Sequence, residues 1–132
     1  LPDGTIITGK NSPLLHASSS LILNAAKHLA GLPDKMYLLP ETLLDSVTHL
    51  KKDILNGKMA SLDVDEMLIV LGISALSNPA AKMTLETLKQ FRNCEVHLTH
   101  IPTPGDEAGW RKLNVNLTCD PEYPGKSLFF SS

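Results

Sequence analysis

The sequence lacks the features that mark several classes of protein. It has two cysteines in 132 residues, so it is not a disulfide-rich scaffold. Its twelve basic residues are outnumbered by fourteen acidic ones, which leaves no positive excess for binding a phosphate backbone. The longest apolar run covers residues 67–71, whereas a membrane-spanning helix needs about 20 residues. We therefore expect no nucleic-acid partner and no membrane span.

The sequence does contain enough apolar material for one folded domain. Apolar residues make up 42% of the chain, and its length fits a single domain that needs no disulfide. We assign that domain to residues 1–123 and a C-terminal tail to residues 124–132. The first residue, Leu1, is not a methionine and no signal-like region follows it, which indicates a piece of a longer cytoplasmic protein. Without a secretion signal, Cys94 and Cys119 are expected to be reduced thiols.

Capping residues and apolar spacing predict five helices. Apolar side chains recur at helical spacing after five start signals, which are Ser12, Pro40, Asp63, Asn78 and Thr103. Glu66 follows Asp63 by three residues, which predicts a capping pair at the start of the third helix. The inner face of that helix is formed by Val64, Met67, Leu71 and Ala75. Ile69, Val70 and Ile73 make the helix apolar nearly all round. We therefore expect it to be deeply buried.

Four short segments have the composition of β-strands. They cover residues 5–8, 36–39, 94–99 and 115–118, and helices separate them. This alternation predicts an α/β fold, a three-layer αβα sandwich around a small mixed sheet. Because the sheet has so few strands, we expect another part of a longer protein, or a partner, to complete one of its edges.

The loop after the first predicted strand is the first candidate site. Gly9, Lys10, Asn11 and Ser12 lie between a strand end and a helix start, where free N–H groups and the Lys10 charge favour an anion. Residues 4–11 nearly match a nucleotide-binding P-loop, but their variable positions form the strand itself. Asn11 also replaces the hydroxyl residue that would hold magnesium, so we reject nucleotide hydrolysis. The alternative to an anion site is a capped turn with a solvated lysine.

A second candidate site combines His97, His100, Asp106 and Glu107, near the end of the third predicted strand and the start of the next helix. Histidine and carboxylate side chains can form a metal site or an acid–base pair. The structural alternative is that both acidic residues stabilise the helix N-terminus and the histidines are polar surface. No zinc signature is present, so we expect no metal and no cofactor.

Five stretches, in order along nearly the whole chain, carry a resemblance to a known family. They are Thr8-Gly9-Lys10-Asn11-Ser12-Pro13-Leu14-Leu15, Leu29-Ala30-Gly31, Asn78-Pro79-Ala80-Ala81, Gly105-Asp106-Glu107-Ala108-Gly109 and Leu117-Thr118-Cys119-Asp120-Pro121. Together they resemble the C-terminal portion of an uncharacterised bacterial family, domain of unknown function 1846. The resemblance implies the final quarter of a longer protein, with a three-layer topology similar to cytidine deaminases. The zinc motif of those enzymes is absent, so deamination is not implied.

Two functions of different classes stay open at this point. The first is a non-catalytic α/β domain that packs against upstream domains of the same chain and supports a homo-oligomer. The second is an enzyme active site completed between domains. In that case the loop from Gly9 to Ser12 binds a phosphate or carboxylate, and His97, His100, Asp106 and Glu107 handle protons or a metal. A protein-interaction module with an exposed sheet edge is a third, less favoured reading.

Overall fold

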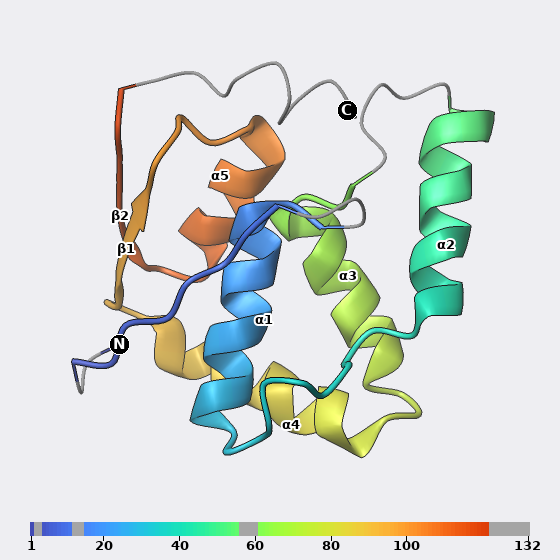
Figure 1. Ribbon diagram of the computed structural model, residues 1–132, viewed down its shortest axis with the longest axis horizontal. Coiled ribbons are helices and arrows are strands. Elements are labelled where there is room, and N and C mark those ends of the chain that lie inside the picture. The colour runs from blue at the N-terminus through green and yellow to red at the C-terminus, as the bar shows by residue number, and fades with distance from the viewer. Residues whose placement is uncertain (2–3, 12–14, 56–60, 122–132) are drawn as a thin grey trace.

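The chain folds as a mixture of helices and a small parallel sheet (Figure 1). The computed structural model describes residues 1, 4–11, 15–55 and 61–121. The elements in order are α1 (Ala17–Leu29), α2 (Glu41–His49), the π-helical turn η1 (Leu50–Ile54), α3 (Val64–Ser74), α4 (Pro79–Thr87), the 3-10 turn η2 (Leu88–Phe91), β1 (Glu95–Leu98), α5 (Pro104–Lys112) and β2 (Asn116–Cys119). The predicted α/β class is confirmed, whereas the predicted tail at 124–132 lies outside the described residues.

Local capping signals determine where three of the helices begin. At α3, the Asp63 side chain accepts the Glu66 N–H at 2.9 Å, and the Glu66 side chain accepts the Asp63 N–H at 3.0 Å. This is the capping pair that the sequence predicts. Asn78 caps α4 by accepting the Ala80 N–H, and Thr103 caps α5 in the same way. Each cap satisfies N–H groups that have no partner within the helix.

The first helix begins later than the sequence suggests. The predicted start, Ser12, lies outside the described residues, and the described α1 begins at Ala17. The Ala17 N–H donates to the Asn11 side-chain oxygen at 2.7 Å, so a residue upstream of the helix closes its first turn. At the other end, Gly31 adopts a φ of +72°, the left-handed conformation that commonly ends a helix.

The core lies between α1, α3, α4 and α5, which pack against one another. Trp110 from α5 is 1% exposed, and Ile22, Val64, Met67 and Leu71 are fully buried. The inner face of α3 is therefore as predicted. The expectation of burial all round is wrong, because Ile69 and Ile73 are 66% and 48% exposed. The neighbouring helices cover the side of α3 that carries Met67 and Leu71, and the described residues leave the side that carries Ile69 and Ile73 uncovered.

The sheet has two strands in the described part of the chain. β1 and β2 are parallel, with Glu95 opposite Asn116 and Leu98 opposite Cys119, and α5 connects them. A small sheet is confirmed, but its strands are parallel rather than mixed. Because a parallel pair needs a crossover connection, α5 must lie on one face of the sheet. Both cysteines are free, Cys94 buried and Cys119 exposed.

The predicted strands at residues 5–8 and 36–39 are wrong, because neither segment belongs to a sheet. Residues 5–8 are not hydrogen-bonded into a ladder, and the Thr8 carbonyl instead accepts the Asn24 side chain of α1 at 2.9 Å. Leu38 and Leu39 are both buried, as two neighbours in a half-exposed strand would not be. β-branched and apolar composition indicates a segment that can pair, but not whether a neighbour is available.

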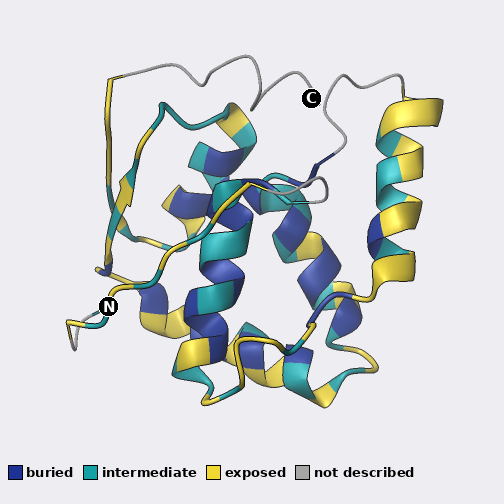
Figure 2. Ribbon diagram, in the orientation of Figure 1, coloured by how far each residue is buried: buried dark blue, intermediate teal, exposed yellow. Residues whose placement is uncertain are grey.

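One helix has little packing within this chain. α2 stands apart from the other helices at the edge of the molecule, and most of its surface is exposed (Figure 2). Leu44 is its only buried residue. The helical apolar spacing predicted after Pro40 continues into η1. There, however, Leu50 and Ile54 are 44% and 59% exposed. Within the described ranges, every helix is too short or too polar to traverse a lipid bilayer.

Candidate functional site

A cavity of about 260 Å³ opens at the carboxyl end of β1. The N-terminal residues of α1 and the loop that leads into α5 form its walls. In an open parallel sheet this is the edge at which ligands commonly bind, because loops and helix N-termini gather there. The polar residues that line it include Asn11, His16, Ser18, His97, His100, Thr103 and Asp106.

The cavity brings together residues from both predicted sites. Gly9 and Asn11 come from the first site, and His97, His100 and Asp106 come from the second. The two groups are far apart in the sequence, and the fold places them on opposite walls.

Two other predicted site residues, Lys10 and Glu107, are not part of the described lining of the cavity. Lys10 is exposed beside it. Glu107 lies on the outer side of α5, where it pairs with Arg111 at 2.6 Å. Ser12 is outside the described residues.

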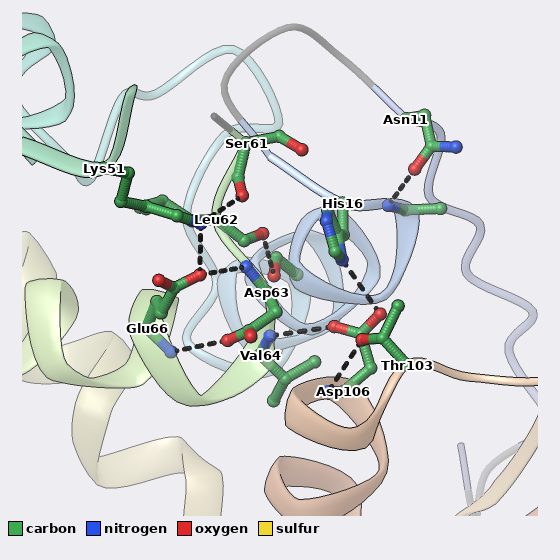
Figure 3. A network of polar contacts seen from close by, with 12 residues as sticks. Asn11, His16, Lys51, Ser61, Leu62, Asp63, Val64, Glu66, Thr103 and Asp106 are labelled. Carbon is green, nitrogen blue, oxygen red and sulfur yellow. Dashed lines mark hydrogen bonds and ion pairs between the residues drawn. The ribbon is translucent and has the colours of Figure 1, made fainter. Parts of the chain in front are cut away.

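Asp106 is the most buried acidic residue of the site, and its carboxylate joins three helices. One oxygen contacts His16 Nδ1 at 2.9 Å, and the other accepts the Val64 N–H at 2.9 Å (Figure 3). These contacts place the carboxylate beside the N-termini of α1, α3 and α5. Helix N-termini carry partial positive charge, so a buried negative charge is stabilised there. Both carboxylate oxygens are therefore already engaged within the fold.

His16 is a residue that sequence reasoning missed. It precedes α1, it is 8% exposed, and its backbone N–H donates to the Leu62 carbonyl at 2.9 Å. Ser19 also donates to that carbonyl, at 3.0 Å. The ring of His16 contacts Asp106, which is ninety residues away, and no local sequence pattern signals such a contact. The helix predicted to begin at Ser12 includes His16, and nothing in the sequence marks this ring for a buried contact.

A second polar cluster adjoins Asp106 at the start of α3. Lys51 of η1 contacts Glu66 at 2.6 Å and donates to the Ser61 carbonyl at 2.8 Å (Figure 3). The pKa of the Asp63 carboxyl is raised, chiefly because the group is buried. The negative charges of Glu66 and Asp106 also raise this pKa, whereas the hydrogen bond from the Glu66 N–H lowers it. The Lys51 contacts join η1 to α3, and the contacts between Asp63 and Glu66 cap α3.

His97 of β1 and His100, which follows the strand, differ in their surroundings. His97 is exposed, and its ring contacts Thr118 Oγ1 at 2.8 Å and Asp120 at 3.1 Å. The Nδ1 atom of His100 is buried and has no hydrogen-bond partner among the described residues. A buried polar atom without a partner costs free energy, so His100 is the group of this cavity that would gain most from a ligand.

The chemistry that this arrangement offers is limited to binding and proton transfer. No group of three metal-ligating side chains converges within the described ranges. The cavity instead presents hydrogen-bonding side chains and one buried histidine–carboxylate pair. Such groups can orient a small polar molecule or exchange a proton with it.

The fold and the site define a small α/β domain whose buried polar groups mainly join helix ends. A family model described as "Domain of unknown function DUF1846, C-terminal" matches residues 1–129, and the chain belongs to this family. The resemblance read from the sequence is thereby confirmed.

The relatives are much longer than this chain. A UPF0371 protein of Clostridioides difficile (strain 630) is 41% identical over 131 residues, which cover 99% of this chain and 26% of the relative. A UPF0371 protein of Clostridium tetani is 39% identical over 132 residues, 100% of this chain and 26% of the relative. The chain thus spans about a quarter of the length of these relatives, as expected for a C-terminal domain of a longer protein.

Proposed function

We propose that this chain is a non-catalytic domain that packs against the rest of a larger protein through the outer side of α3. The observation that carries this proposal is an uncovered row of apolar side chains, the α3 stripe, formed by Ile69, Ile73 and Leu76. Ile69 and Ile73 are four residues apart, so they share one side of the helix, and Leu76 lies in the turn that follows α3. Their exposed fractions are 66%, 48% and 87%.

The neighbouring helix supports the same conclusion. Leu50 and Ile54 of η1 are also exposed, and Lys51 between them pairs with Glu66 of α3. Glu66 lies three residues before Ile69, on the same side of α3 as the α3 stripe. A soluble protein rarely leaves this much apolar surface on adjacent elements unless another surface covers it. In this proposal the preceding part of a larger protein covers it, since three quarters of the relatives' length lies outside the matched region.

The proposal extends to assembly and to the sheet. A surface of this kind also suits a homo-oligomer, in which a second copy adds to the same contact. We propose further that the sheet gains strands from the rest of the protein and then becomes the middle layer of a three-layer sandwich, in a cytoplasmic protein. The deaminase-like topology would follow only from such a completed sheet.

A double substitution in the α3 stripe tests the packing proposal. Ile69→Asp with Ile73→Asp should lower the melting temperature of the longer protein by several degrees, because two charges would be buried at the contact. The same pair should leave the 132-residue chain nearly unchanged, because both side chains are solvent-exposed there.

The matched control for this test is Tyr37→Asp, at a side chain that is 91% exposed outside the stripe. It should leave the melting temperature of both proteins unchanged. Equal effects of the double substitution on the two proteins would contradict the proposal. A change in molar mass by light scattering, without a change in melting temperature, would assign the stripe to contacts between copies.

A second candidate function is favoured by the convergence of both predicted sites on one cavity. In this proposal the cavity is part of an inter-domain active site that takes a small molecule bearing a phosphate or carboxylate. His100 Nδ1 lacks a partner among the described residues, and Lys10 supplies positive charge beside the cavity. His97 and His100 would contact the ligand, whereas Asp106 would hold His16 in place.

Titration of the longer protein with inorganic phosphate and with acetate tests this second function. His100→Ala should weaken binding at least tenfold, and His97→Ala and Lys10→Ala should weaken it by smaller factors. Lys112→Ala removes a positive charge from the far end of α5 and serves as the control. Unchanged affinity in His100→Ala would exclude the cavity as the binding site.

A further inference from the structure

We propose that an extended segment of the larger protein, from outside this chain, adds a strand to the open edge of β1. The segment would enter the β1 slot, which is the space between residues 4–8 and residues 94–97. This inference rests on the proposal that the domain packs against a larger protein, and it names a second contact. The β1 slot and the α3 stripe lie on different elements, so the two contacts can be tested separately.

The hydrogen-bond pattern shows which edge of β1 is open. The Asn116 N–H donates to the Cys94 carbonyl at 2.8 Å, and the Asp120 N–H donates to the Leu98 carbonyl at 2.9 Å. In a parallel pair of strands, every second residue directs both its N–H and its carbonyl group to the same neighbouring strand. Even-numbered residues of β1 therefore bond to β2, and Glu95 and His97 direct their N–H and carbonyl groups to the other edge. β1 has no second strand partner in the described part of the chain.

The space beside this edge has the size and lining for a peptide. A cavity of about 450 Å³ separates residues 4–8 from residues 94–97. Its other walls are apolar, formed by Leu21 and Ala25 of α1, Phe91 and Trp110. Trp110 is 1% exposed, and its indole N–H has no acceptor among the described residues. A strand with apolar side chains on one face would fill this cavity, and its carbonyl groups could accept the free N–H groups.

Residues 4–8 cannot close the slot by themselves without losing their present contacts. Gly9 lies directly on α1, where a β-carbon would overlap the backbone of Ala17 and Leu21. The Thr8 carbonyl is held by Asn24 at 2.9 Å. These contacts hold the end of the segment on α1 and away from β1. The segment is not a strand of the described sheet, and Ile6 is 88% exposed, so the segment forms the far wall of the slot.

The geometry also excludes β1 of a second copy as the occupant of the β1 slot. β1 of another copy already carries β2 on one edge, so it could not enter a slot bounded on both sides by backbone. Only a single strand with two free edges fits. The remaining three quarters of a protein like the relatives can supply such a segment, and the family model is itself described as C-terminal.

Amide hydrogen exchange at single-residue resolution in the longer protein tests whether the edge is filled. Val96 and Leu98 donate to β2, so their N–H groups are the internal reference for Glu95 and His97. With a strand in the slot, all four amides should exchange within about tenfold of one another after correction for intrinsic rates. Exchange of Glu95 and His97 at least about 100-fold faster than the reference would overturn the inference. Ile69→Asp with Ile73→Asp should leave this ratio unchanged, which separates this result from the α3 stripe.

Two further measurements identify the occupant. Cysteines placed at Ile7 and Glu95 of the longer protein should not form a disulfide. With a strand between them they lie about 9.5 Å apart, beyond the limit of about 7 Å between Cα atoms. Formation of that disulfide would assign the edge to residues 5–8 and overturn the inference. Protection of Glu95 and His97 should also be independent of protein concentration, and loss of protection on dilution would assign the slot to a second copy.

Discussion

At the scale of single residues, two neighbouring carboxylates have opposite roles. Asp106 is 6% exposed and contacts His16 and the Val64 N–H from two other segments, whereas Glu107 pairs with Arg111 on the surface of its own helix. The sequence assigns both residues to the same helix N-terminus, and only packing distinguishes them. Their substitution therefore compares a buried histidine–carboxylate contact with an exposed ion pair.

Asp106→Ala is expected to destabilise the protein by about 3 kcal/mol. The substitution removes the acceptor of the buried Val64 N–H and the carboxylate contact of the His16 ring, and breaking a buried pair is costly. Glu107→Ala should stay within about 0.5 kcal/mol, because exposed pairs contribute little. Urea unfolding followed by circular dichroism measures both. Similar losses in the two variants would show that the Asp106 contacts do not join the helices.

The raised pKa of Asp63 predicts a dependence of stability on pH. A folded chain with a raised carboxyl pKa binds more protons than the unfolded chain between the ordinary and the raised value. The stability contributed by Asp63 therefore falls as pH rises through that window. Asp63→Asn keeps a capping oxygen without the charge, so it should be at least as stable as the wild type at pH 7, with an advantage that shrinks on acidification.

The control for this pH dependence is Asp63→Ala, which also removes the cap. It should cost about 1 kcal/mol at pH 7. Thermal unfolding from pH 3 to pH 8 compares the three proteins. If Asp63→Asn were as destabilised as Asp63→Ala at every pH, the geometry of the Asp63 carboxylate rather than its charge would dominate.

At the scale of elements, two helical glycines should respond to alanine with opposite signs. Gly109 of α5 lies against Val64 of α3, and an added β-carbon would overlap that side chain. Gly109→Ala should therefore push α5 away from α3 and cost about 1–3 kcal/mol. Gly72 of α3 has open space beside it, so Gly72→Ala should stabilise by about 0.5–1 kcal/mol. Equal effects in urea unfolding would contradict the close contact of α3 with α5.

The helices were more predictable than the strands, for a physical reason. Caps such as Asp63 with Glu66, or Asn78 before a proline, act within four residues, so the sequence contains the whole signal. A strand needs a neighbour from elsewhere, and nothing in residues 5–8 states whether that neighbour lies in this chain. The strand that follows Cys94 was predictable because β2, its partner, is available after a single crossover helix.

The candidate site was predictable in its residues but not in its arrangement. The sequence indicated Gly9, Asn11, His97, His100 and Asp106 as two groups, each from local reasoning about a strand end and a helix start. Their meeting in one cavity depends on packing between α1 and α5. His16 was missed for the same reason, since its ring contact with Asp106 is purely tertiary.

At the scale of the whole molecule, the packing is uneven. α1, α3, α4 and α5 share one core, and α2 with η1 is joined to them by the buried Leu44, by the partly buried Leu43 and Val47, and by Lys51. Regions with few buried apolar contacts open at lower free energy than the core of the same protein. The exposed apolar residues of η1 thus lie in the part of the fold with the fewest buried contacts, and Lys51 of η1 links that part to α3. A larger protein would stabilise this region most.

Native-state hydrogen exchange should reveal this difference. In the 132-residue chain, amides in the second half of α2 are expected to exchange through local opening at a free energy at least about 2 kcal/mol below that of the α3 amides. The α3 amides should exchange only with global unfolding, because Met67 and Leu71 are fully buried. In the longer protein the gap should narrow, since burial of Leu50, Ile54 and the α3 stripe would hold α2 in place. Equal protection of α2 and α3 in the 132-residue chain would mean that α2 needs no outside partner, and the packing proposal would lose its second support.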